Sequence, residues 1–131
     1  MTNSSIQSYR DLEVWQEGMN LAAACYQITR AFPKEEMYGA ISQIRRAGAS
    51  IPANIAEGYG REYRAEYIQF LRIAQGSLKE LETHLLLAQR VEIATSQAIE
   101  PVLKKCDTVG KMLRALIRSL ENSNKNSKSS R

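Results

Sequence analysis

The sequence predicts an all-α protein folded as an up-down-up-down four-helix bundle. At 131 residues and 44% hydrophobic content, the chain suits one domain with one core. Leu, Ile and Ala recur every three to four residues over four long segments, and the chain has only two Phe and one Trp, which favours helix-on-helix packing over a sheet. Four long helices with short connections alternate in direction by default. We expect a flexible N-terminus at 1–10, the bundle at 11–121 and a disordered basic tail at 122–131.

The first helix is predicted to begin with Asp11 as its N-cap and to run to about Ala31, before Pro33 stops it. It carries two apolar stripes, so its apolar surface is wider than contact with two neighbouring helices requires. The first stripe is Leu12, Trp15, Met19, Ala22 and Tyr26, and the second is Val14, Gly18, Leu21, Cys25 and Ile28. Either one stripe faces another subunit, or both surround the bundle core.

The second helix covers residues 41–60, ISQIRRAGASIPANIAEGYG, whose apolar residues step by three and four straight through Pro52. A proline inside a helix removes one backbone hydrogen bond and pushes its ring towards the carbonyl four residues back, which here belongs to Gly48. We therefore predict one helix, kinked near Pro52, with Gly48 leaving room for the bend. The alternative is a break at Ser50, with Pro52 in the first turn of a new helix.

The third helix is predicted from about Arg64 to Arg90. Its core stripe has unbroken heptad spacing and consists of Tyr67, Leu71, Ala74, Leu78, Leu81, Leu85 and Ala88. Further apolar side chains widen this helix's apolar surface beyond what one core uses. These are Phe70, Ile73, Leu86 and Leu87.

The fourth helix is predicted from about Ala98 to Leu120, with Pro101 either in its first turn or at a small kink. Its predicted core face is Ile99, Val102, Cys106, Val109, Leu113, Leu116 and Leu120. The remaining NSNKNSKSSR contains no apolar residue, so it cannot bury enough surface to offset the entropy of ordering. This is the reason for expecting a disordered tail.

The chain lacks the residue patterns of common catalytic and metal sites. His84 is the only histidine, and Cys25 and Cys106 are too far apart in the sequence for a CxxC zinc pattern. No GxxxxGK[ST] phosphate loop occurs. We therefore expect no enzyme, no cofactor and no metal. The polar N-terminus and the absence of an apolar run of about 18 residues predict a cytoplasmic protein without a membrane segment.

Two polar residues of the second helix, Asn54 and Glu57, lie three positions apart and hence on nearly the same face. We predict structural roles for both. Asn54 is expected to bond the backbone freed near Pro52, and Glu57 to pair with Arg61 one turn on. The alternative is a ligand site.

Positive charge is concentrated towards the C-terminus. The net charge is +4, but residues 102–131 hold eight Lys or Arg against two acids, giving +6, whereas residues 1–101 hold ten against twelve, giving −2. On the fourth helix the basic residues recur at three- and four-residue steps. These residues are Lys104, Lys111, Arg114 and Arg118, and Lys105 lies beside them in the sequence. We predict that they bind nucleic acid, together with Arg45 and Arg46 of the second helix. Either they contact phosphates or they form an ordinary solvated face.

Three segments resemble a known family: YRDLEVWQ at 9–16, SQIRRAGASIPANIAEGYGR at 42–61 and FLRIAQGSLKELETHLLLA at 70–88. They look like the four-helix-bundle proteins encoded within intervening sequences of bacterial large-subunit (23S) ribosomal RNA genes. The resemblance covers about residues 9–120, and IPANIAEG is its most specific part. It implies an up-down bundle that assembles as a homopentameric ring. By position, Arg45 and Arg46 match paired arginines of the family.

The resemblance also suggests kinship to the similarly shaped accessory proteins of diversity-generating retroelements, which bind nucleic acid and a reverse transcriptase. Two functions are therefore expected. The first is a non-enzymatic, RNA-associated oligomer that contacts phosphates through the C-terminal basic stripe. The alternative is a protein-binding scaffold, such as a reverse-transcriptase accessory subunit, in which an exposed face binds a polymerase partner and charge is secondary.

Overall fold

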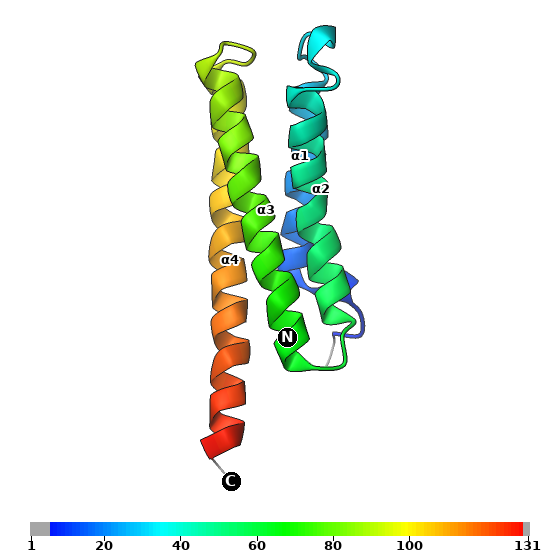
Figure 1. Ribbon diagram of the computed structural model, residues 1–131, viewed down its shortest axis with the longest axis vertical. Coiled ribbons are helices and arrows are strands. Elements are labelled where there is room, and N and C mark those ends of the chain that lie inside the picture. The colour runs from blue at the N-terminus through cyan, green and yellow to red at the C-terminus, as the bar shows by residue number, and fades with distance from the viewer. Residues whose placement is uncertain (1–5, 130–131) are drawn as a thin grey trace.

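The computed structural model describes the backbone of residues 6–129 and the side chains of residues 6–123 (Figure 1). Within these limits the chain forms four α-helices and two short 3₁₀ turns, without a β-strand. The helices are α1 (Glu13–Thr29), α2 (Ala40–Tyr59), α3 (Arg64–Arg90) and α4 (Ser96–Ser129), and the turns are η2 (Tyr9–Asp11) and η3 (Lys34–Glu36). The predicted all-α four-helix bundle is confirmed.

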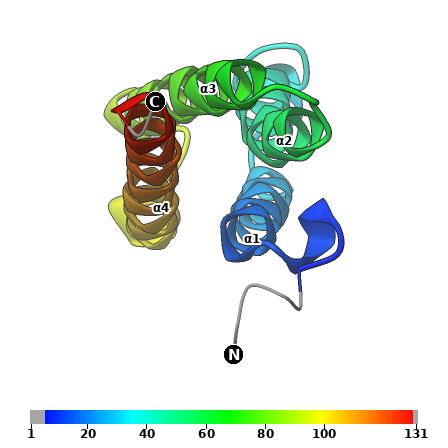
Figure 2. The same cartoon turned by 90° about the horizontal axis from the view of Figure 1, so that it is seen from below.

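The four helices stand side by side along the long axis of the molecule. The connections from α1 to α2 and from α3 to α4 lie at one end, and the connection from α2 to α3 lies at the other (Figure 1). Seen from below, α2 lies between α1 and α3, and α4 lies beside α3 (Figure 2). The contacts between helices follow the same order, since α1 packs on α2 and α4, and α3 packs on α2 and α4.

The core fills the space between the helices, and the predicted periodicities locate most of it. On α3 every predicted stripe position from Leu71 to Ala88 is buried, and Tyr67 is half-buried against the core. On α4 the stripe is buried as predicted up to Leu113. Beyond it Ile117, four residues on, is buried in place of the predicted Leu116, which is only half-buried.

The start of α1 differs from the prediction. Leu12, not Asp11, is the N-cap residue, and the helix begins at Glu13. Asp11 instead belongs to the preceding turn η2, where its carboxylate accepts hydrogen bonds from the backbone of Gln7 at 2.8 Å and of Ser8 at 3.2 Å. The turn is anchored by Tyr9, whose ring packs edge-on against Trp15. The expected flexible segment 1–10 therefore includes part of an ordered turn, and its residues 1–5 lie outside the described chain.

Helix α2 is continuous through Pro52, so the alternative of a break at Ser50 is wrong. A Cβ added to Gly48 would lie 3.0 Å from Cys25 Sγ, and one added to Gly18 would lie 3.5 Å from Pro52 Cβ. Both glycines thus stand where α1 and α2 approach each other closely. The structure therefore gives Gly48 a role in helix packing, whereas the kink near Pro52 stays a prediction.

Helix α4 is longer than predicted at both ends. Thr95 caps it by accepting a hydrogen bond from the backbone of Ala98, so it begins at Ser96 and Pro101 lies beyond its first turn. At the other end the helix continues to Ser129 because no Gly or Pro follows Leu120 to stop it. The expected disordered segment 122–131 overlaps this extension, and residues 130 and 131 lie outside the described chain.

Candidate nucleic-acid interface

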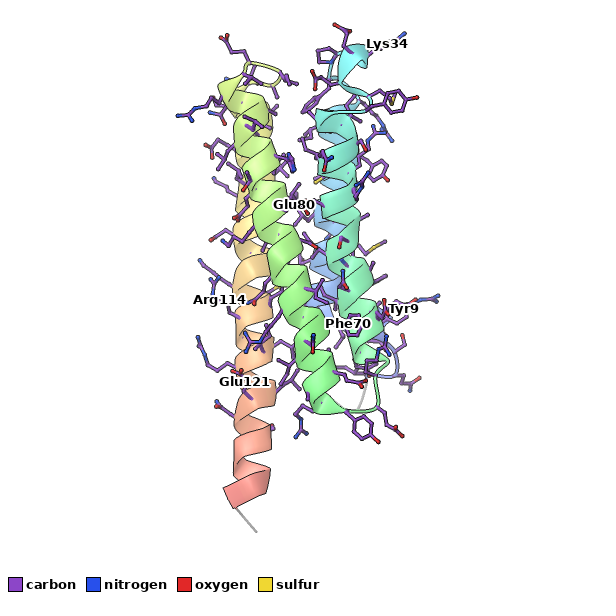
Figure 3. The ribbon with its side chains drawn as sticks, in the orientation of Figure 1. Tyr9, Lys34, Phe70, Glu80, Arg114 and Glu121 are labelled. Atoms are coloured by element: carbon purple, nitrogen blue, oxygen red, sulfur yellow. The ribbon has the colours of Figure 1, made fainter. Side chains whose placement is uncertain are left out.

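A row of exposed cations runs along α4. Steps of seven, three and four residues place its members on one side of the helix, away from the buried core positions. We call Lys104, Lys111, Arg114 and Arg118 the α4 basic stripe. In Figure 3 the labelled Arg114 lies at the outer edge of the bundle along α4, on the side opposite Tyr9.

Lys105 is exposed but does not belong to this stripe. Each residue of an α-helix turns by about 100° relative to the one before it, so Lys105 faces a different direction from Lys104. It is therefore the one predicted α4 cation that the helix separates from the others.

Acidic residues neutralise only part of the α4 basic stripe. Lys111 Nζ lies 3.2 Å from Asp107 Oδ2, and both side chains are well exposed. Among the described residues, Lys104, Arg114 and Arg118 have no acidic partner within salt-bridge distance. Exposed pairs contribute at most about 1 kcal/mol, so Lys111 can exchange Asp107 for another anion at little cost.

The fold also brings two cations of α3 to the neighbourhood of α4, and sequence reasoning missed both. Arg72 forms an ion pair with Glu121 of α4, and Lys79 pairs with Glu82 at 3.1 Å on α3 itself. Lys79 follows Arg72 by seven residues, so it lies on nearly the same side of α3. Arg72 and Glu121 are 49 residues apart in sequence, so no local pattern signals their contact.

The predicted arginine pair on α2 is divided between two environments. Arg45 is half-buried, its Nε donates to Thr29 Oγ1 at 2.8 Å, and its guanidinium carbon lies 4.7 Å from the centre of the Tyr26 ring. Arg46 is exposed and has no ion-pair partner among the described residues. Neither joins the α4 basic stripe, because α1 and α3 are the neighbours of α2 in the bundle (Figure 2).

Both polar residues near Pro52 make local contacts and the predicted Glu57–Arg61 pair is confirmed, but Asn54 bonds Ser50 and not the Gly48 carbonyl that Pro52 leaves without its helix donor. Asn54 Nδ2 donates to the backbone carbonyl of Ser50 at 2.8 Å, and Glu57 pairs with Arg61 at 2.9 Å. The Ser50 hydroxyl in turn shares a 2.8 Å hydrogen bond with Ser77 of α3. These contacts occupy the side chains locally and link α2 to α3.

The two thiols are held in the core and are unsuited to chemistry. Burial raises the pKa of both Cys25 and Cys106 to about 12, so neither forms a thiolate near neutral pH. Within the described part of the chain, no three or more His, Cys, Asp or Glu side chains gather as metal ligands. Nor does any helix there have the length and apolar character needed to cross a membrane.

Comparison with known proteins places the chain in a family. No curated protein matches it. A crystal structure described as a protein of unknown function from the S23 ribosomal protein family of Bacteroides thetaiotaomicron superposes with a TM-score of 0.72 at 28% identity, covering 79% of this chain and 97% of that one. Residues 10–115 match the family described as 23S rRNA-intervening sequence protein. Because this match covers well over half of the chain, the protein belongs to the 23S rRNA-intervening sequence protein family.

Proposed function

We propose that the protein is a non-enzymatic, RNA-associated bundle that contacts phosphates through the α4 basic stripe. The observation that carries the proposal is the alignment of four exposed cations on one helix face, three of them without an acidic partner among the described residues. The family's description, which refers to intervening sequences of 23S rRNA, supports RNA as the nucleic acid. Neither that description nor that of the similar crystal structure names an enzymatic activity.

The chemistry of such a contact is electrostatic. Lysine and arginine side chains on a helix surface replace the counterions around phosphates, and the release of those counterions drives binding. Arg72 and Lys79 extend the positive surface from α4 onto α3 and would exchange their carboxylate partners for phosphate oxygens. Contacts to phosphates carry no sequence information directly, so the RNA would be recognised by shape and backbone, with little sequence preference.

Assembly would multiply this surface. We infer a homopentameric ring in the bacterial cytoplasm, the assembly that the family resemblance implies, so that several α4 basic stripes act on one RNA. Light scattering tests the subunit number, because a pentamer has five times the 14.8 kDa mass of the chain. A stable dimer would exclude the pentamer, and a monomer would exclude assembly altogether.

The decisive experiment compares two triple variants by filter binding to one structured RNA between about 50 and 200 mM salt. The first variant changes Lys111, Arg114 and Arg118 to Gln. We expect weaker binding and a log-log salt slope that is smaller by about 3, one for each lost phosphate contact. The matched control removes equal charge elsewhere, at the exposed Arg30, Lys34 and Arg64.

The control should bind nearly as well as the wild type. If both triple variants lose the same affinity, the RNA responds to net charge and not to the stripe. If the stripe variant binds as tightly as the wild type, the α4 basic stripe is only a solvated face and the proposed function falls.

A further inference from the structure

An apolar groove lies on the outside of the bundle between α1 and α2. It has a volume of about 500 Å³ and an almost wholly apolar lining. Its walls include Trp15, Met19 and Tyr26 of α1 and Ala49, Ala53 and Ala56 of α2, and we call it the α1–α2 groove. Met19 and Tyr26 are each more than two-fifths exposed. Apolar surface collected in a groove indicates an interaction site more often than a free surface.

A second unpartnered surface lies on α3. Ile73, Leu87 and Val91 are 45 to 55% exposed, and together with Gly76 and Glu80 they share one side of the helix at steps of three, four and seven residues. We call these five residues the α3 outer face. A Cβ added to Gly76 would meet nothing within 4 Å. A glycine inside an exposed helix is about 1 kcal/mol less favourable than alanine, and no contact within the subunit requires it here.

Small residues occur on both surfaces. The α2 wall of the α1–α2 groove is made of alanines, and small residues let a second helix backbone approach closely. Gly76 provides the same on the α3 outer face. A helix lying along the groove with Gly76 against the alanines would bring the neighbouring Ile73 towards the larger side chains of the α1 wall, such as Trp15 and Met19.

The two surfaces are complementary in charge. Arg46 lies three residues before Ala49 and seven before Ala53, so it is on the same side of α2 as these two residues of the groove wall. Glu80 lies midway between Ile73 and Leu87 on the α3 outer face. Both side chains are exposed, and neither has an ion-pair partner among the described residues.

We propose that the α1–α2 groove of one copy receives the α3 outer face of a second copy, with Arg46 facing Glu80 across the contact. This inference rests on the self-association included in the proposed function and identifies the surfaces that produce it. Each subunit offers two different surfaces, so the contact is heterologous, and such contacts form rings when the rotation closes. The α1–α2 pair and α3 lie along adjacent sides of the bundle (Figure 2), so successive copies turn relative to one another.

A charge exchange tests the pairing directly. Arg46→Glu and Glu80→Arg are each expected to raise the dissociation constant between subunits at least tenfold, because like charges then face each other. The double variant restores the opposite pair and should return the constant to within about threefold of wild type. Analytical ultracentrifugation over a concentration series measures it. Single variants that associate like wild type, or a double variant without rescue, would overturn the proposal.

A second pair of variants tests the groove itself. Ala53→Glu places a charge on the groove wall, whereas Ala115→Glu places one on the exposed side of α4, outside both surfaces. Only the first should dissociate the assembly, and circular dichroism should show that both remain helical. Equal effects of the two variants would contradict the assignment.

The outcomes separate this inference from RNA binding. If the wild-type protein is a monomer, the docking proposal fails while the salt titration still tests the α4 basic stripe. If the protein assembles but the Arg46 and Glu80 variants leave assembly unchanged, the proposed function stands and only the assigned surfaces are wrong. The α4 triple variant should assemble normally, since the stripe lies outside both contact surfaces.

Discussion

Arg45 and Thr29 connect α2 to α1 through a 2.8 Å hydrogen bond from Arg45 Nε to Thr29 Oγ1. Thr29 is almost fully buried, and its hydroxyl in turn donates a hydrogen bond to the backbone carbonyl of Cys25 at 2.7 Å. The guanidinium stacks over the ring of Tyr26 on the same helix. Arg45 therefore holds two helices together, although its neighbour Arg46 points to solvent.

Replacing Arg45 should lower the stability of the protein. Arg45→Gln removes the donor to a buried hydroxyl and the stacking on Tyr26, so we expect the free energy of unfolding in urea to fall by roughly 1 to 3 kcal/mol. Thr29→Ser keeps the hydroxyl and should retain the coupling, whereas Thr29→Val loses it. In a protein that already carries Thr29→Val, Arg45→Gln should lower the free energy of unfolding by measurably less than it does in the wild type. Additive effects of the two changes would show that the bond contributes nothing.

The fold was predictable from the sequence because helix periodicity is local. The α3 stripe from Leu71 to Ala88 repeats every three or four residues, and burial in the bundle follows it directly. Helix ends were less predictable. Asp11 is a good N-cap residue, but its carboxylate accepts hydrogen bonds from Gln7 and Ser8 in the turn before α1. The sequence alone does not show whether this aspartate caps the helix or closes the preceding turn.

The candidate site was predictable only where it lies on one helix. The cations of the α4 basic stripe are close in sequence, so spacing alone places them together. The pairing of Arg72 with Glu121 depends on how α3 packs on α4. The division between Arg45 and Arg46 depends on α1, since only the packed helix supplies Thr29 as a partner. Tertiary contacts of this kind leave no periodic signal.

Gly58 of α2 packs directly against α3, so this position should not accept a side chain. A Cβ there would lie 2.7 Å from Phe70 Cβ and 3.2 Å from the backbone oxygen of Tyr67. Gly58→Ala should therefore reduce the free energy of unfolding by roughly 1 to 3 kcal/mol, the usual cost of overpacking. Gly60→Ala is the control, since its Cβ would have contacts of 3.6 Å or more. Equal thermal midpoints for the two variants would refute the close contact.

Stability should fall at alkaline pH because of the buried thiols. Their ordinary pKa of 9.0 applies to the unfolded chain, and burial raises the pKa of Cys25 and Cys106 in the folded chain to about 12. Between these values the unfolded state releases protons that the folded state retains, so the free energy of unfolding decreases as pH rises from about 9 towards 12. Below pH 9 this contribution to stability is fully present.

The test is urea unfolding at several pH values between about 8.5 and 10. Burial also raises the pKa of Tyr67, but the ordinary value of that group is 10.0, so the thiols dominate this window. A variant carrying Cys25→Ala and Cys106→Ala should be less stable overall because of the lost packing, but its stability should depend less on pH. The same pH slope in both proteins would exclude the thiols as the cause.

The turn after α3 contains a strained residue whose replacement should stabilise the protein. Glu92 has a φ of 64°, in the left-handed region that favours glycine. The backbone N–H of Ile93 bonds to the carbonyl of Ala88 at 2.9 Å, and that of Glu92 bonds to the carbonyl of Gln89 at 3.1 Å. This is the Schellman arrangement, in which the residue at the position of Glu92 is usually glycine.

Glu92→Gly should therefore raise the free energy of unfolding by roughly 0.5 to 1 kcal/mol. Glycine removes a left-handed backbone strain of about 1 to 2 kcal/mol, but part of this gain is lost because glycine also makes the unfolded chain more flexible. A carboxylate at a helix C-terminus is itself unfavourable, so Glu92→Gln is needed to measure the effect of charge alone. Glu92→Ala removes the charge and keeps the strain. If all three variants gain equally, charge and not backbone conformation limits stability at this turn, whereas a gain for glycine alone identifies the left-handed backbone as the cause.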